Sequence, residues 1–155
     1  MFQKIVRTDK SKTTIIIRLM VGTIFLSEGI QKFLLPTIRG VGRFEKMGFS
    51  NPDIWGNLVG FCEILCGLLL LFGLLTRVAA SGMLINMSVA IIITKIPIAF
   101  GESFRPFNLR ELSNYGFWSF AHEVRTDLAM WLGSLFLILK GGGFWSIDKN
   151  MYKIK

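Results

Sequence analysis

The chain has 155 residues, of which 52% are hydrophobic, and its mean hydropathy of +0.52 is too high for an ordinary soluble domain of this size. The net charge of +8 would also suit a nucleic-acid-binding protein, but the basic residues are spread over predicted loops and tails instead of gathering on one amphipathic face. Membrane proteins need such basic loops to set their topology. The composition therefore predicts one compact membrane domain, with the lipid bilayer and not nucleic acid as its partner.

The first apolar stretch covers residues 13–35 and follows a basic tail at residues 1–12. A secretory signal peptide begins in a similar way. Here, however, Arg18 interrupts the stretch, Glu28 and Lys32 follow it closely, and no small-residue cleavage site is found. We therefore predict a first transmembrane helix that is retained in the protein.

The second predicted helix covers about residues 55–75, and its only charge beyond the first turn is Glu63. Gly56, Gly60 and Gly67 share a helical face with this carboxylate. Stripes of small residues let transmembrane helices approach closely. Glu63 is therefore expected to lie at a tight contact with another helix, which must supply its partner.

The third predicted helix covers about residues 78–95 and returns beside the second, because the connection at Thr76 and Arg77 is very short. The fourth covers about residues 115–140 and stops at a run of three glycines, which favour the end of a helix. Residues 144–155 form a second basic tail. The sequence thus predicts an all-α protein with an antiparallel four-helix transmembrane bundle at residues 13–143.

The fourth helix carries four titratable groups, His122, Glu123, Arg125 and Asp127, directly before the uncharged residues 128–139. A span of about 20 residues that includes this run contains the charges within the membrane. Ionisable residues at the centre of a span cost roughly 2.5–3.5 kcal/mol each on insertion scales, and they normally face the bundle interior or a wet cavity.

Basic residues near the helix ends favour an orientation with both termini in the cytoplasm. That side would carry nine of them, Lys4, Arg7, Lys10, Lys12, Arg77, Lys140, Lys149, Lys153 and Lys155. The other side would carry six, Arg39, Arg43, Lys46, Lys95, Arg105 and Arg110. In this orientation most of the intramembrane charges lie in the outer half of the bilayer.

We therefore predict an intramembrane polar network, with the outer-half charges joining the first, second and fourth helices. Its candidate residues are Arg18, Glu28, Lys32, Glu63, His122, Glu123, Arg125 and Asp127. Glu28 and Lys32 are spaced to pair along one helix. For Glu63, Arg125 is the preferred partner, with Lys32 and Arg18 as alternatives. The sequence leaves open whether the network is structural or is a proton or substrate site.

Several motifs together resemble the DoxX family of small membrane proteins. They are Arg18-Leu-Met-Val-Gly22 with Phe25, Glu28-Gly29 and Gln31-Lys32-Phe33, then Glu63-Ile-Leu-Cys-Gly67, Gly73-Leu-Leu-Thr-Arg77-Val-Ala-Ala80, and Gly141-Gly-Gly-Phe-Trp-Ser-Ile-Asp148. The resemblance implies a four-helix bundle in the inner membrane. The charged group from His122 to Asp127 departs from the simplest family pattern.

The resemblance also implies a link to redox proteins. One family member is a small subunit of an archaeal thiosulfate:quinone oxidoreductase, and another belongs to a mycobacterial membrane oxidoreductase complex with a superoxide dismutase and a sulfurtransferase. This implies a subunit handling quinone or sulfur species or acting in oxidative stress, with other oxidoreductase subunits or a second copy of the chain as partners. A quinone is the cofactor that the resemblance suggests.

The residues themselves yield no reaction and leave two function classes. His122 is the sole histidine, and its position relative to the carboxylates lacks the spacing of a carboxylate-histidine metal site, so we predict no metal site. No nucleotide-binding motif is found, so we predict no nucleotide cofactor. Cys62 and Cys66 are one helical turn apart and leave a redox role open. The alternative to a redox subunit is a non-catalytic protein, or one that transports protons or a small solute, with a structural charge network.

Overall fold

The computed structural model describes residues 6–153, and every regular element in that part of the chain is a helix. The long helices are α2 (Thr14–Leu34), α4 (Pro52–Phe72), α5 (Thr76–Ala90) and α7 (Phe117–Lys140). A π-helical turn, η1 (Ile91–Lys95), and α6 (Ile96–Phe100) continue α5, and the short helices are α3 (Val41–Lys46) and α8 (Ile147–Lys153). The predicted all-α class is confirmed.

Three helices of the described chain are long and apolar enough to cross a membrane: α2, α4, and the continuous helix from Thr76 to Phe100. The 24-residue helix α7 is also long enough. It is not among the three because Glu123, Arg125, Asp127 and Lys140 interrupt its apolar composition. The structure is therefore that of an all-helical protein with three candidate membrane spans.

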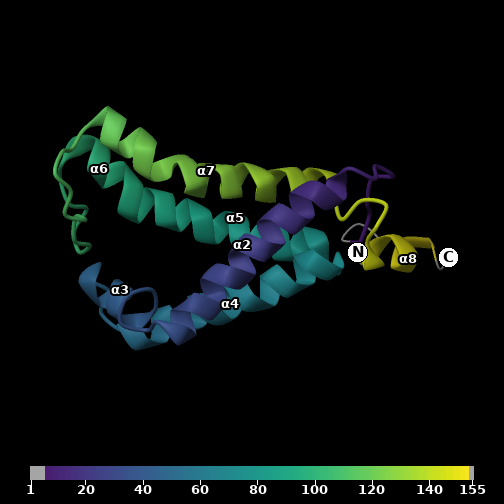
Figure 1. Cartoon of the computed structure of the whole chain (residues 1–155), viewed down its shortest axis with the longest axis horizontal. Coiled ribbons are helices and arrows are strands. Elements are labelled where there is room, and N and C mark those ends of the chain that lie inside the picture. The colour runs from purple at the N-terminus through teal and green to yellow at the C-terminus, as the bar shows by residue number, and fades with distance from the viewer. Residues whose placement is uncertain (1–5, 154–155) are drawn as a thin grey trace.

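The long helices are arranged as two pairs, since α2 packs along α4 and α5 packs along α7. In Figure 1 the pairs come together at the end where the two chain termini lie, and they diverge toward α3 and α6 at the other end. We call these the terminal end and the distal end. The turn from α4 to α5 lies at the terminal end, next to α8.

Glycines make the contact between α2 and α4 close. A Cβ atom at Gly67 would lie 2.7 Å from the backbone nitrogen of Leu26, and one at Gly29 would lie 2.8 Å from the carbonyl oxygen of Gly60. Real Cβ atoms essentially never approach that closely. The glycine stripe predicted on the second helix therefore packs against the first helix.

The core lies where the two pairs meet. Its buried side chains come from all four long helices and are Val21, Phe25, Leu70, Ala79, Ala80, Met83, Met87, Met130 and Leu137. Many other large apolar side chains are exposed, among them Phe61 and Leu132. Such an exposed apolar surface is what lipid would cover.

The bounds of the second and third helices differ from the sequence prediction. The second helix begins at Pro52, since proline is well suited to a first helical turn, and ends where Gly73 adopts a φ of 66°. The third helix does not stop near Lys95. Its π turn leads into α6, where Pro97 again occupies a first-turn position that needs no backbone donor.

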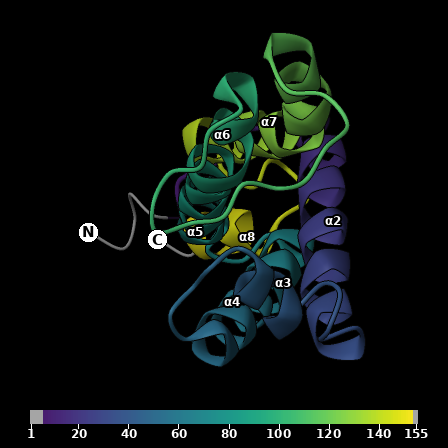
Figure 2. The same cartoon turned by 90° about the vertical axis from the view of Figure 1, so that its left-hand side faces the viewer.

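A segment without helix or strand, residues 101–116, connects α6 to α7 at the distal end and contacts the chain that follows α3. The backbone nitrogen of Asn108 donates to the carbonyl oxygen of Met47 at 2.9 Å, and its side-chain amide donates to that of Lys46 at 3.0 Å. The rings of Phe49 and Phe107 are 4.9 Å apart. Figure 2 shows this segment crossing from α7 toward the α3 side of the molecule.

Candidate functional site

The most deeply buried ion pair in the described chain joins α2 to α4. The Nζ atom of Lys32 lies 2.5 Å from Oε2 of Glu63, and both side chains are more than nine-tenths buried. The amide of Asn86 on α5 donates to the other oxygen, Oε1, at 3.0 Å. Three helices therefore meet at one carboxylate, and we call Lys32, Glu63 and Asn86 the central triad.

The local sequence explains why these side chains can meet. Glu63 lies on the glycine-lined face of α4, and a Cβ atom at Gly60 would lie 3.3 Å from Cβ of Lys32. The backbones are therefore near enough for a lysine to reach across. Because each carboxylate oxygen of Glu63 has a hydrogen-bond donor, its charge is satisfied despite the loss of water.

The structure corrects the two pairings that the sequence favoured. Glu63 is bound by Lys32, one of the alternatives, and not by Arg125, because α4 packs against α2 and α5 while α7 packs mainly against α5. Glu28 does not pair with Lys32 either. Instead, the Oε1 atom of Glu28 lies 3.7 Å from Nη1 of Arg39, at the exposed edge of α2.

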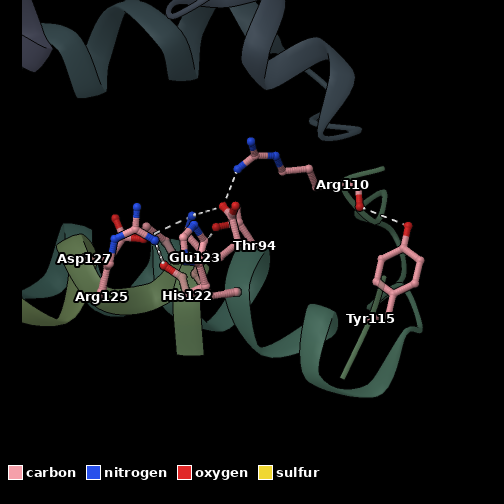
Figure 3. Close-up of polar contacts among 9 residues, drawn as sticks. Thr94, Arg110, Tyr115, His122, Glu123, Arg125 and Asp127 are labelled. Atoms are coloured by element: carbon pink, nitrogen blue, oxygen red, sulfur yellow. Dashed lines mark hydrogen bonds and ion pairs between the residues drawn. The ribbon is translucent and has the colours of Figure 1, made fainter. Parts of the chain in front are cut away.

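A second polar group, which we call the distal cluster, joins η1, α7 and the segment 101–116 (Figure 3). The Nζ atom of Lys95 lies 3.5 Å from Oε2 of Glu123 and 3.3 Å from Oδ2 of Asp127. Arg110 binds the same Oε2 atom of Glu123 at 2.5 Å. Two cations thus neutralise the two carboxylates of α7.

Lys95 ends the π-helical turn and is only 7% exposed. A single π turn shifts the register of side chains on a helix, and such turns are frequent at functional sites. The sequence analysis assigned Lys95 to the end of the third helix but left it out of the candidate site, along with Asn86 and Arg110. A lone lysine at the end of an uncharged helix was the available signal.

His122 and Arg125 take part in neither group. Both are exposed, and the Nη1 atom of Arg125 donates to the backbone carbonyl of His122 one turn earlier (Figure 3). Within residues 6–153 no three His, Cys, Asp or Glu side chains are grouped so that they could hold a metal ion.

Arg18 lies at the terminal end of the molecule, away from the other candidates. Its Nη1 atom donates to the carbonyl oxygen of Gly142 at 2.6 Å, and Nη2 donates to that of Trp145. The chain after α7 is therefore held against α2. The predicted single network is wrong, because the eight residues divide among the central triad, the distal cluster, this terminal contact and exposed positions.

Asp148 completes the terminal contact. It is 1% exposed, and its two carboxylate oxygens accept hydrogen bonds from the backbone nitrogens of Leu75 at 2.7 Å and Thr76 at 2.8 Å. Its own backbone nitrogen donates to Gly73 at 2.9 Å. The carboxylate thus caps the start of α5, where the first backbone donors have no helical partner.

The cysteines lie one turn apart on α4. Cys62 and Cys66 are half-buried free thiols that pack against the apolar core. This position is compatible with their being small core residues.

Comparison with known proteins agrees with the family resemblance that the sequence motifs indicated. The DoxX family model matches residues 13–96. A protein of Mycobacterium tuberculosis that is described as an uncharacterized membrane protein is 45% identical over 150 residues, which are 97% of this chain and 88% of that protein. No solved structure matches the chain significantly. The extent of both sequence matches shows that this chain belongs to the DoxX family of membrane proteins.

Proposed function

We propose that this protein is an integral subunit of an oxidoreductase system in the bacterial inner membrane, and that it supports the assembly of that system instead of carrying out its chemistry. The system would handle quinone or sulfur species, as the redox-linked members of the DoxX family suggest. In this proposal α7 is a fourth span, both termini are cytoplasmic, and the partners are other oxidoreductase subunits.

One observation carries this proposal: the charged side chains of the central triad and the distal cluster are matched with one another. Glu63 is neutralised by Lys32 and also hydrogen-bonded by Asn86, while Glu123 and Asp127 share Lys95. A side chain that binds or transports a substrate needs a hydrogen-bonding position that is not already occupied by another protein group. Charges that already satisfy one another are what an intramembrane structural contact needs.

The same pairing supports α7 as a span. Its carboxylates face Lys95 and Arg110 of the neighbouring segments, so much of their cost in a membrane is offset within the protein. The uncharged residues 128–139 that follow would lie within the hydrocarbon.

A second candidate function is proton exchange with a quinone at Glu63, which lies at the junction of three helices. A quinone takes up protons when it is reduced, and a buried carboxylate with a lysine beside it is a group that could exchange them. In that case the central triad would be a proton-exchanging site and its charge would be indispensable.

The two functions differ in what happens when the charges are replaced by apolar groups. We would delete the gene in the native bacterium and complement it with wild type, with the double variant Lys32→Met/Glu63→Leu, or with Arg125→Gln as an exposed control. Quinone reduction by isolated membranes is measured with sulfur donors, and protein amounts are compared by immunoblot.

A structural pair predicts that the double variant restores quinone reduction, since apolar replacement of a whole buried pair is often neutral or stabilising. Loss of activity at normal protein level would assign the chemistry to the triad. If deletion leaves quinone reduction unchanged with every donor, and an affinity-purified sample from native membranes contains no oxidoreductase subunit, the proposed redox system is wrong.

A further inference from the structure

The terminal end of the molecule holds a polar cavity that no part of the proposed function uses. Its volume is about 500 Å³, and it is partly open to the surface. It lies where the chain before α2 passes over the C-terminal end of α7 and the start of α5. The lining residues are Arg7, Thr8, Asp9, Arg77, Leu139 and Lys140.

Hydrogen bonds hold the walls of this cavity in place. The guanidinium of Arg77 donates to the carbonyl oxygens of Arg7 at 2.9 Å and Leu139 at 3.0 Å. The backbone nitrogen of Asp9 donates to the carbonyl oxygen of Lys140 at 2.9 Å, and the hydroxyl of Thr8 accepts from the backbone of Gly143 at 2.5 Å. Four separate contacts thus join residues that are far apart in the sequence.

The cavity carries a positive charge that the described residues do not neutralise. Lys140 lies 3.3 Å from Asp9, and the hydrogen bond from Lys140 keeps the pKa of that carboxyl below its usual value. This pair is therefore internally balanced at neutral pH. Arg7 and Arg77 have no ion-pair partner within residues 6–153, and the Nη1 atom of Arg77 has no hydrogen-bond partner there.

One side of the cavity continues into an exposed apolar face of α7. Leu139 lines it and is 67% exposed, and Phe136 and Leu132 continue the same exposed face along α7. The end of the molecule is also marked as a membrane interface by the exposed ring of Trp145. A ligand here would meet arginines at the headgroup level and an apolar helix face below them.

We propose that this cavity binds the phosphate group of an anionic phospholipid, with Arg7 and Arg77 on the phosphate and an acyl chain along Leu139, Phe136 and Leu132. Guanidinium groups suit phosphate oxygens because several donors lie in one plane. Basic sites between helices at the membrane surface are a recurrent form of lipid recognition. The apolar helix face favours a lipid over a phosphate ion from solution, which needs no such surface.

The test measures lipid binding to the purified full-length protein by native mass spectrometry, with dioleoyl phosphatidylglycerol and dioleoyl phosphatidylcholine as probes. Wild type should retain phosphatidylglycerol preferentially. Arg7→Gln should weaken that binding by about fivefold, the effect of one basic residue near a membrane surface. Only the backbone of Arg7 makes a hydrogen bond in the described chain, so this variant should fold normally.

Two further variants sharpen the test. Asp9→Asn removes the carboxylate that neutralises Lys140 and should strengthen phosphatidylglycerol binding. Arg43→Gln removes a cation from α3 at the distal end and should leave it unchanged.

Equal retention of the two lipids, or equal binding by Arg7→Gln and wild type, would overturn the proposal. So would an equal loss in Arg43→Gln, which would indicate general charge attraction. Displacement of the lipid by excess inorganic phosphate would assign the cavity to a soluble phosphate and overturn the lipid assignment.

Discussion

Single residues show how this protein tolerates charge in an apolar setting. Glu63 accepts hydrogen bonds from Lys32 of α2 and from the amide of Asn86 of α5, so both of its carboxylate oxygens are bound. Lys95 forms ion pairs with two carboxylates of α7. In each case the partner comes from another segment of the chain, and the charged residue therefore specifies which segments lie side by side.

Removing one member of the central pair should cost more than removing both. Glu63→Gln and Lys32→Met should each lower the free energy of unfolding by about 3–5 kcal/mol, because each strands a buried partner. The double variant should recover part of the loss. Thermal unfolding in detergent gives the coupling energy, and strictly additive losses would contradict the observed pairing.

The distal cluster should show a smaller effect, since its carboxylates are about one-fifth exposed and Arg110 remains on Glu123. Lys95→Gln should cost roughly 1–3 kcal/mol, between the values for exposed and buried pairs. Arg125→Gln is the matched control, because this exposed side chain binds only a local carbonyl. The same thermal assay compares them, and equal losses would show that Lys95 is not the anchoring cation.

Asp148 should matter for stability although it lies in the predicted basic tail. Asp148→Asn keeps the side-chain shape, but one of the two backbone donors, from Leu75 or Thr76, would face an amide NH₂ in place of an oxygen. A buried unsatisfied donor costs about 1–3 kcal/mol. Glu111→Gln, in an exposed part of segment 101–116, should be neutral in the same detergent melt. A neutral Asp148→Asn would rule out the capping role.

At the scale of helices, the pairing of α2 with α4 depends on glycines, while α5 and α7 meet through larger side chains. Trp131 of α7 donates its indole hydrogen to the hydroxyl of Ser88 on α5 at 2.9 Å. Methionines Met83, Met87 and Met130 fill the space where the two pairs meet. Such flexible side chains adapt to the irregular gap that two diverging pairs leave.

Two glycines on different helices allow a matched test of this packing. Gly67→Ala should destabilise the protein by about 1–3 kcal/mol, since its new methyl group would overlap the backbone of Leu26. Gly82→Ala should be neutral or stabilising, because the nearest atom would be the sulfur of Cys66 at 3.6 Å and alanine favours a helix. Thermal melts of both variants decide it. Equal stability would mean that α2 and α4 are not in close contact.

At the scale of the whole molecule, the two ends differ in chemistry. The terminal end combines Arg7, Lys10, Lys12, Arg77, Lys140 and Lys149 with Trp145 and the chain that follows it. The distal end carries the Lys95 cluster and the segment 101–116, which closes over α3. The proposed orientation with cytoplasmic termini rests on the excess of basic residues, nine to six, on the terminal side of the whole sequence.

Orientation can be measured directly. In a background with Cys62 and Cys66 replaced by alanine, a cysteine at Lys10 should be protected from a membrane-impermeant maleimide in whole cells, and one at Glu102 should be labelled. Labelling of both after the membrane is broken controls for accessibility. Labelling of Lys10 alone in whole cells would reverse the proposed topology.

The sequence by itself determined the helical class, the apolar character of the chain and the close-packing face of α4. These features follow from local composition and from the 3.6-residue period of a helix, and Gly56, Gly60, Glu63 and Gly67 are all buried on one face of α4. The family resemblance was also visible, because the motifs at Arg18, Gly73 and Asp148 are conspicuous in the chain.

Only the tertiary structure decided which charges meet. Periodicity tells which residues share a face, but it does not tell which helix that face contacts. Arg125 and Lys32 were both at a suitable depth for Glu63, and Lys32 binds it because α2 lies against the glycines of α4 while α7 lies mainly along α5. Lys95 likewise reaches Glu123 and Asp127 from the end of a π turn, which the sequence analysis did not predict because a periodic apolar pattern indicates a helix without showing a local change in its hydrogen bonding.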